Sequence, residues 1–312
     1  MRDALHDLCA RQGYFLTRDA LAAGYTETAF YRAVRRGDVE RLRHGTFSLP
    51  ETWAGLDADA RHRVLIDAVL ARSLVEPVVT HTSAVLLHTA GWWDLDLSSV
   101  HVTHPHRRSE RRESGVVHHQ SRVPEQHLAV VGGVPTVTAA RAAIELTTVA
   151  DTERSLVVMD SLLRERKVTP DELQDMADHA RAWPGTLGTR MAVNLADGAS
   201  GSVGESRSRF QFWRGGIPAP VLQHRVMDGK RLVAVLDFWW PEHGLAGEFD
   251  GMAKYGRLVP EGMTPADVLA AEKQREDEVR ELLGCRFIRY TWQDLDRRAR
   301  MIDRTRSMLG LA

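Results

Sequence analysis

Acidic residues within two neighbouring apolar runs are the strongest constraint on how this chain can fold. The runs Leu232–Trp240 and Leu245–Asp250 predict adjacent strands, and a short proline-to-glycine turn separates them. Asp237 lies within the first run and Glu248 within the second. Because an unpaired buried carboxylate is expensive, these acids indicate that a positive group holds them there. A divalent cation, which binds carboxylate oxygens, is the natural candidate.

Length and composition limit the classes of protein that fit. The chain has 312 residues, which suits two or three domains, and its net charge is −1, so any nucleic-acid surface must be a local patch. The two cysteines, Cys9 and Cys285, give no disulfide framework and no zinc motif. No apolar run has membrane-spanning length and no signal-peptide pattern begins the chain. We therefore expect no membrane association and a cytoplasmic, nucleoid-associated protein.

The pattern along the chain predicts a multidomain α/β protein. We expect a small helical domain over residues 1–50, a mixed middle domain over 51–195 and an α/β core with a mixed sheet over 196–312. In the first domain, helices over 18–23 and 27–36 flank a glycine turn, with Thr17 and Thr26 as caps. Two short strand-like runs follow. This order predicts a winged helix-turn-helix.

Arginines gather on the second of these helices and on the wing. They are Arg32, Arg35 and Arg36 on the helix and Arg41 and Arg43 on the wing. Arginines in these places suit contacts to phosphates and base edges of DNA. Two alternatives remain: a solvated helix face, since Asp38 and Glu40 are close by, or a module that docks another protein.

The first domain resembles the N-terminal winged helix of AbiEi-type antitoxins. The matching runs are Leu16–Gly24 and Arg35–Phe47, and weaker matches continue at Thr80–His88 and Gly133–Arg141. The resemblance implies sequence-specific DNA binding, autorepression and a partner toxin protein.

The middle domain is less informative. We expect helices over 61–71, 82–88, 138–148 and 151–165, and strands over 100–103 and 116–119. The charged run Arg107–Arg112 fits either a solvated hairpin loop or a second phosphate-contacting patch. Five histidines cluster here: His101, His104, His106, His118 and His119. Since His118 and His119 point to opposite faces of a strand, they cannot easily share one metal, and a metal site here is the less favoured interpretation.

The small residues of Asp197–Ser202 predict a linker to the last domain. There the pattern predicts a helix over 205–213, strands over 221–226, 232–240 and 245–250, a helix over 267–283, a strand over 286–290 and a final helix over 293–309.

Each acid of this domain also has a plainer interpretation. Glu205 fits a capping box with Ser202, Asp237 a strand-end turn, and Asp250 a simple turn before glycine. Glu248 and Asp250 share a strand face, where like charges repel unless a cation, a base or a proton intervenes.

This domain resembles the PD-(D/E)XK restriction-endonuclease-like nucleases, particularly the branch of the very-short-patch-repair endonucleases. The matching runs are Gly204–Arg209, Leu222–Gln223, Val235–Phe238, Glu248–Gly251, Glu272–Arg275 and Arg289–Trp292. The resemblance implies that Asp237 and Glu248 ligate Mg²⁺ or Mn²⁺, that Glu205 completes the acidic cluster and that Gln223 lies beside it.

Two departures from the family pattern matter. Asp250 stands where the family has a lysine, and Leu236 replaces the proline. Lys254 fits either a displaced catalytic cation or a surface lysine. Arg275 fits either a phosphate contact or a solvated helix face.

The preferred interpretation is a metal-dependent DNA endonuclease joined to a winged-helix DNA reader, acting in defence or DNA repair. The metal would polarise the scissile phosphate and help to generate hydroxide, with Asp250 and Lys254 among the catalytic residues. One site per chain predicts a nick unless the protein forms a homodimer. The alternative is an AbiEi-type antitoxin and transcriptional repressor with an inactive nuclease-like domain. A third interpretation is an antitoxin that neutralises a partner toxin by binding it.

Overall fold

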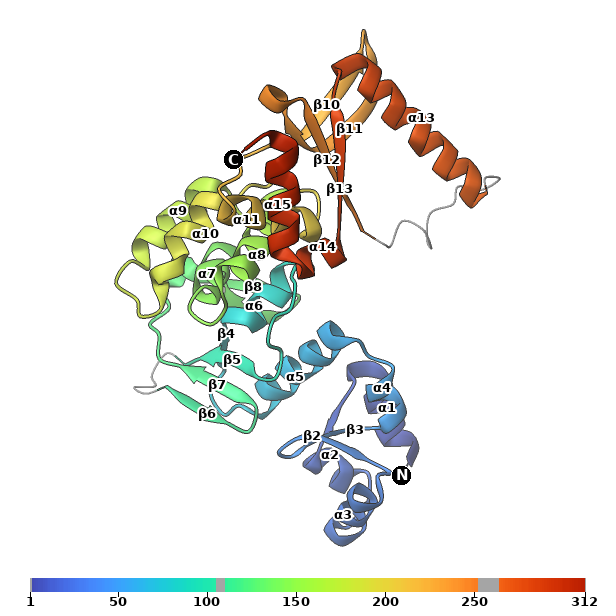
Figure 1. The fold of residues 1–312 in the computed structure, drawn as a ribbon. Helices are drawn as coiled ribbons and strands as arrows, with labels where there is room; N and C mark the ends of the chain where they lie inside the picture. The colour runs from blue at the N-terminus through green and yellow to red at the C-terminus, as the bar shows by residue number, and fades with distance from the viewer. Residues whose placement is uncertain (1, 105–109, 252–263, 312) are drawn as a thin grey trace. The chain divides into compact units, whose positions relative to one another are not determined.

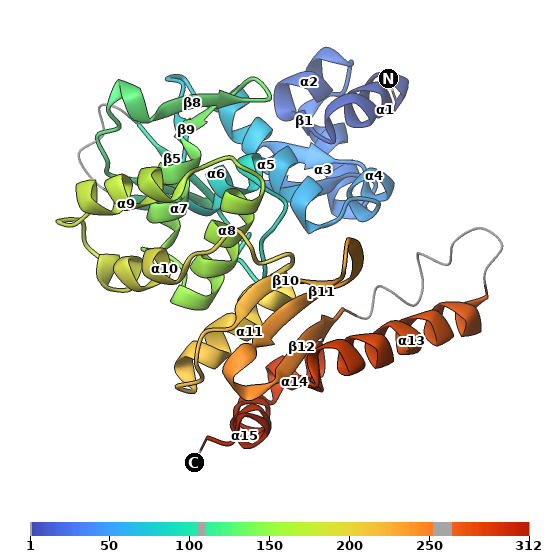
Figure 2. The ribbon, with the colours of Figure 1, turned by 90° about the horizontal axis from the view of Figure 1, so that it is seen from above.

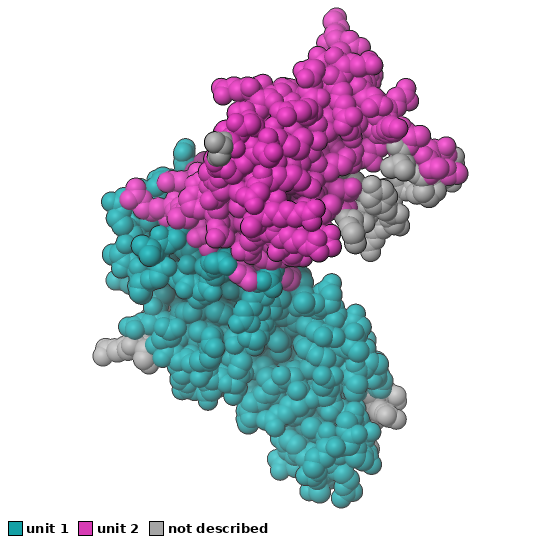
Figure 3. Space-filling model, in the orientation of Figure 1, with its two compact units in different colours: residues 1–90, 94–151, 171–189 teal, residues 91–93, 152–170, 190–312 magenta. Residues whose placement is uncertain are grey.

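The computed structural model describes residues 2–104, 110–251 and 264–311. The chain forms two compact units, coloured separately in Figure 3. The first unit comprises Met1–Ala90, Asp94–Asp151 and Asp171–Thr189, and the second comprises Gly91–Trp93, Thr152–Pro170 and Arg190–Ala312. Both units mix helices with sheets, which confirms the multidomain α/β class. No helix in the described ranges is both long and apolar enough to cross a membrane.

A winged helix-turn-helix begins the first unit (Figure 1). Its elements are α1 (Arg2–Gln12), β1 (Phe15–Leu16), α2 (Thr17–Ala22), α3 (Glu27–Arg36), β2 (Glu40–Arg43) and β3 (Thr46–Ser48), with sheet order β1-β3-β2. Phe30 of α3 packs edge-on against Phe47, with ring centroids 4.8 Å apart, and this contact holds α3 against the wing. Thr26 caps α3 as expected. Thr17 does not cap α2, because it lies inside that helix and Asp19 binds the Leu16 amide instead.

The remainder of the first unit is built on a six-stranded sheet of order β6-β7-β5-β4-β9-β8. The strands are β4 (Val78–Val79), β5 (Val100–Thr103), β6 (Arg111–Glu113), β7 (Val116–His119), β8 (Leu128–Val131) and β9 (Val134–Val137). The helices are α4 (Pro50–Ala54), α5 (Ala58–Arg72), α6 (His81–His88), η1 (Glu125–His127), α7 (Ala139–Leu146), α9 (Pro170–His179) and η2 (Thr186–Gly188). The expected α5, α6, α7, β5 and β7 are confirmed.

Part of the charged run between the expected middle-domain strands lies outside the described residues, as does His106. Its last two arginines, Arg111 and Arg112, lie exposed in the short strand β6, which pairs with β7. The described end of the run is therefore a hairpin strand at the edge of the sheet.

The second unit has the predicted order of helix, three strands, helix and strand. Its elements are α8 (Thr152–Arg164), α10 (Thr189–Leu195), α11 (Val203–Arg214), β10 (Val221–Asp228), β11 (Arg231–Trp240), η3 (Pro241–His243), β12 (Leu245–Asp250), α13 (Pro265–Leu283), β13 (Arg286–Thr291), α14 (Trp292–Asp296) and α15 (Arg298–Leu309). The sheet order is β10-β11-β12-β13, and β13 alone runs parallel to its neighbour. The single final helix that we expected is broken at Arg297, whose backbone (φ −105°, ψ 53°) is not helical.

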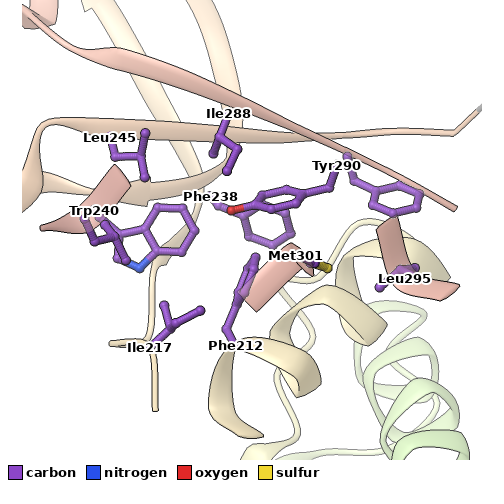
Figure 4. Close-up of a cluster of buried hydrophobic side chains, with 11 residues drawn as sticks. Phe212, Ile217, Phe238, Trp240, Leu245, Ile288, Tyr290, Leu295 and Met301 are labelled. Atoms are coloured by element: carbon purple, nitrogen blue, oxygen red, sulfur yellow. The ribbon is translucent and has the colours of Figure 1, made fainter. Parts of the chain in front are cut away.

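Two hydrophobic clusters cover opposite faces of this sheet. On one face, Phe212 of α11 packs with Phe238, Trp240 and Tyr290 (Figure 4). On the other face, Val279 of α13 belongs to a cluster that includes Ala246. Figure 2 shows α11 and α13 on opposite sides of the strands. Because side chains alternate along β12, the residues two and four beyond Ala246, which are Glu248 and Asp250, share the face toward α13.

Two buried ion pairs join α8 to α11. Arg207 Nε lies 2.8 Å from Glu153 Oε1, and Arg209 Nη1 lies 2.7 Å from Asp160 Oδ2. Asp160 also accepts a hydrogen bond from the backbone amide of Asp197. Burial raises the pKa of the Asp160 carboxyl to about 6 even with Arg209 beside it. These contacts connect α8 with the second unit, although the boundary expected at residue 195 leaves it in the middle domain. They also tie down a segment that we expected to be a linker.

Replacing Asp160 by alanine should lower the free energy of unfolding of the second unit by about 3–5 kcal/mol, because Arg209 would remain in a largely buried site without its partner carboxylate. Urea unfolding followed by tryptophan fluorescence measures this. The matched control is Asp303→Ala, an exposed residue on α15, which should change stability by about 0.5 kcal/mol or less. Equal effects of the two substitutions would contradict the role of the buried pair.

Candidate active site and nucleic-acid interface

Helix α3 has one buried and one charged face. Thr26 accepts a hydrogen bond from the Ala29 amide at the start of the helix, and Gly37, with φ 79°, ends it. Phe30 and Ala33 are buried, whereas Arg32 and Arg35 are exposed. The helix therefore presents guanidinium groups on the side away from its own core.

The other three arginines differ in their surroundings. Arg36 is exposed and donates to Asp38 Oδ2 at 2.9 Å, and Arg41 on β2 lies 3.2 Å from His44 Nδ1. The structure turns Arg43 inward, where its Nε and Nη1 are buried. Burial first, and then the charge of Arg72, lower the pKa of Arg43. The exposed cationic surface is therefore centred on α3, and Arg43 does not extend it as expected.

In the second unit, Glu205, Gln223 and Asp237 form a connected polar cluster. The Gln223 side-chain amide donates to Glu205 Oε2 at 2.9 Å and to Asp237 Oδ1 at 3.3 Å. The other oxygen of Asp237 accepts from the backbone amide of Phe249 at 2.8 Å. Asp237 thus lies between β10 and β12, in the place that the sequence predicts for a site acid.

Glu205 belongs to this cluster and lies beside the helix cap. Ser202 caps α11 by accepting from the Glu205 amide at 3.2 Å. The Glu205 carboxylate accepts from Ser202 Oγ at 2.9 Å and from the Gly201 amide at 2.7 Å, so only half of the expected capping box is formed. Gly204 allows α11 to lie directly against Phe249, because a Cβ there would come within 2.0 Å of the ring. Burial, followed by the charge of Asp237, raises the pKa of Glu205. Two carboxyl groups thus share a small volume with one bridging amide.

Glu248 has a different partner. Parallel pairing of β12 with β13 sets Glu248 opposite Arg289, and their charged groups lie 3.6 Å apart. Arg289 also binds Glu272 at 2.8 Å and Glu276 at 2.9 Å, both on α13. Although burial opposes the charged form, the hydrogen bonds that Arg289 donates to these two acids raise its pKa. The positive charge beside Glu248 is therefore the guanidinium of Arg289.

The remaining predicted residues are spread around this region. Asp250 is half-buried at the end of β12, in register with Thr291 of β13. Arg275 is exposed on α13, whereas Glu272 and Glu276 of the same helix hold Arg289. Lys254 lies outside the described residues.

Sequence patterns indicated His101 and His119 but missed His81, which joins them in the first unit. Within the described ranges, the set of three ligand atoms that come within 4.8 Å of one another belongs to His81, His101 and His119 rather than to the acids. His81 begins α6, far in sequence from the strand histidines. No local spacing in the sequence connects it to them.

Replacing Gln223 by glutamate should destabilise the second unit by about 2 kcal/mol at pH 8, because two hydrogen bonds to carboxylates become contacts between like charges. The new carboxyl would have a folded-state pKa above its unfolded value. Its penalty is therefore full above the folded-state pKa and is lost as pH falls toward the unfolded one. Urea unfolding at pH 8 and pH 5 tests this beside Gln274→Glu, an exposed position on α13. A loss that is the same at both pH values would disprove the bridging role.

Comparisons with known proteins support the resemblance of the first domain to antitoxins. Residues 4–50 match the family model described as the transcriptional regulator AbiEi antitoxin, which confirms the antitoxin resemblance for the winged helix. Two uncharacterized proteins of Mycobacterium tuberculosis, from strains CDC 1551 / Oshkosh and ATCC 25618 / H37Rv, are each 27% identical over 175 residues. The match covers 55% of this chain and 64% of each relative. The winged helix is thus similar to that of a family of DNA-binding regulators.

Proposed function

We propose that this protein is a transcriptional regulator of the AbiEi antitoxin type that binds duplex DNA through α3. The observation that carries the proposal is the exposed face of α3, with Arg32 and Arg35 opposite the buried Phe30 and Ala33, inside the segment that matches the antitoxin model. A helix of this kind enters the major groove, where a guanidinium group binds guanine edges or phosphates in a bidentate manner.

The exposure of Arg41 on the wing and the pairing of Arg36 with Asp38 indicate how much each of these arginines would contribute to DNA binding. Arg41 on β2 is exposed and suits a backbone phosphate beside the groove. Arg36 would have to leave Asp38 before it could contact DNA, so it contributes less than its neighbours. A homodimer would set two α3 helices on half-sites about 34 Å apart. Repression of its own gene and capture of a partner toxin would complete the antitoxin role.

Arg32→Ala and Arg35→Ala should each weaken binding to a DNA site upstream of the gene by about 1–3 kcal/mol, because each removes a contact to a base edge or a phosphate. Arg36→Ala should have a smaller effect. Fluorescence anisotropy at two salt concentrations provides the measurement, and Arg11→Ala, an exposed arginine on α1, is the matched control. If Arg11→Ala weakened binding as much as Arg32→Ala, general charge attraction would replace the groove model.

A second candidate function is metal-dependent cleavage of DNA by the second unit. The adjacency of Glu205 and Asp237, on a core of helix, three strands, helix and strand, favours it. Their carboxylate oxygens suit Mg²⁺ or Mn²⁺. Burial, followed by the charge of Asp237, raises the pKa of Glu205. Such an ion polarises a phosphate and lowers the pKa of a bound water.

The ion pairs around Glu248 suggest how the site would change when a metal ion binds. Glu248 would join Glu205 and Asp237 only after leaving Arg289, and Glu272 and Glu276 would keep that arginine in place as it leaves. Gln223 would hold the two carboxylates in position. Lys254 and Asp250 are the remaining candidates for moving a proton near the scissile phosphate.

If the second unit cleaves DNA, Asp237→Asn should abolish nicking of supercoiled plasmid in Mg²⁺ or Mn²⁺, because it removes a metal-binding charge, whereas the exposed Glu242→Gln should cleave normally. Product formation is followed on agarose gels with EDTA as a blank. Intact plasmid with the unaltered protein, together with specific DNA binding, would leave only the regulator. Cleavage that survives in Asp237→Asn would point to a contaminating nuclease.

A further inference from the structure

Three histidines from separate elements meet inside the first unit. His81 is the first residue of α6, His101 lies on β5 and His119 ends β7. All three are buried, with 7%, 8% and 9% of their surfaces exposed. His101 Nδ1 lies 2.9 Å from His119 Nε2, and the rings of His81 and His119 stack with centroids 3.6 Å apart.

The sheet explains why these histidines meet and their neighbours do not. In the parallel pair of β5 and β7, His101 is opposite Val117 and Thr103 is opposite His119, so His101 and His119 share one face. His118 points to the other face, where its Nδ1 lies 3.2 Å from His104 Nε2. The expectation that His118 and His119 face opposite ways is confirmed, and it leaves each free to join a different group.

His81 is placed in the cluster at a conformational cost. Its φ of 50° is left-handed, a region that residues with a side chain rarely adopt. Its backbone amide donates to Glu145 Oε2 at 3.2 Å, which holds it there. Strained backbone of this kind gathers at functional sites, where the surrounding structure fixes it.

The ring of His81 carries a buried nitrogen that lacks a hydrogen bond. No described residue gives His81 Nδ1 such a partner, and Glu145 Oε2 lies 3.6 Å away, beyond hydrogen-bond range. Leaving a buried polar atom in this state is unfavourable. A bound cation would satisfy this lone pair, and one ring nitrogen from each of His81, His101 and His119 lies within 4.8 Å of the other two.

Burial also affects the three imidazoles themselves. Burial, followed by the nearby His119, lowers the pKa of His101 to about 3, and burial likewise lowers the pKa of His81 and of His119. His119 Nδ1 lies 3.8 Å from Glu110 Oε1, beyond hydrogen-bond range, so a small movement would let this carboxylate orient a metal-bound imidazole.

The cluster opens on a cavity of about 540 Å³ in the same unit. His81, His119, Glu110 and Glu145 line it, together with Trp183. Glu145 is neutralised by Arg141, whose Nε lies 2.7 Å from its carboxylate. A ligand atom or a water in this cavity would thus meet the histidines and Glu110, whereas the charge of Glu145 is already balanced.

We propose that His81, His101 and His119 bind one Zn²⁺ ion, with the fourth coordination position open to this cavity. Three imidazole nitrogens select Zn²⁺ over Mg²⁺, which prefers oxygen. Tetrahedral bonds of about 2.0–2.1 Å place ligand nitrogens about 3.3 Å apart, so the 2.9 Å contact between His101 and His119 opens slightly around the ion. One of the stacked rings of His81 and His119 turns so that both nitrogen lone pairs point at the ion. The ion replaces the hydrogen bond between His101 and His119 and cross-links α6, β5 and β7.

Zinc titration of the full chain, made without a polyhistidine tag and stripped with EDTA, tests this site. Calorimetry should give one equivalent of bound Zn²⁺, and Co²⁺ should give the visible absorption of a tetrahedral site. His119→Gln should weaken Zn²⁺ binding by at least about 100-fold, whereas His118→Gln, on the opposite face of the same strand, should bind normally. Zinc uptake that is equal in the two variants, or lost in both, would overturn the proposal.

The unaltered protein gives a measurement that does not depend on a variant folding. Zn²⁺ at 100 times its dissociation constant should raise the melting temperature of the stripped protein, whereas Mg²⁺ at the same concentration should not, because an ion that binds only the folded state stabilises it. Melting that is unchanged by Zn²⁺, with no heat of binding, would reject the site. These readouts are independent of DNA binding and of DNA cleavage.

Discussion

The arrangement of the second unit depends on the two buried ion pairs between α8 and α11. Glu153 and Asp160 neutralise Arg207 and Arg209, which follow Glu205 on the same helix. Removing charges from water is costly, so the pairs hold only with both partners in place, and they fix the rotation of α11 about its axis. That rotation points Glu205 toward Gln223 and Asp237. A contact between helices thus determines where the acids of the sheet meet.

The structure separates the acids of the second unit into two groups with different electrostatics. Glu205 and Asp237 share one amide and face each other as like charges, whereas Glu248 is neutralised by Arg289. The pair of Glu205 and Asp237 favours a bound cation, whereas Glu248 already has the guanidinium of Arg289 beside it. The proposed regulator does not depend on either arrangement. In the proposed nuclease, Glu248 would have to leave Arg289 and join Asp237 at a metal.

Local patterns in the sequence predicted much of this fold, because helix caps, helix-ending glycines and strand alternation each involve residues that are close together in the chain. Thr26 and Gly37 mark the ends of α3, and alternation with turn residues marks β11 and β12. Two strands gave no such pattern: β4 has only two residues, and β8 is a run of four apolar residues without alternation. The break at Arg297 has no glycine or proline to announce it. The contacts of Glu248 with Arg289, of Asp160 with Arg209 and of His81 with His119 join distant segments, and no local pattern encodes them.

The central claim is that the exposed face of α3 reads a specific DNA sequence. DNase I footprinting on the region upstream of the gene, at physiological salt and with competitor DNA present, tests it most directly. The account predicts one protected site, or two half-sites about one helical turn apart, that Arg32→Ala and Arg35→Ala abolish while the fold stays intact. Protection that is absent, or that spreads evenly along the DNA and vanishes with competitor, would contradict it.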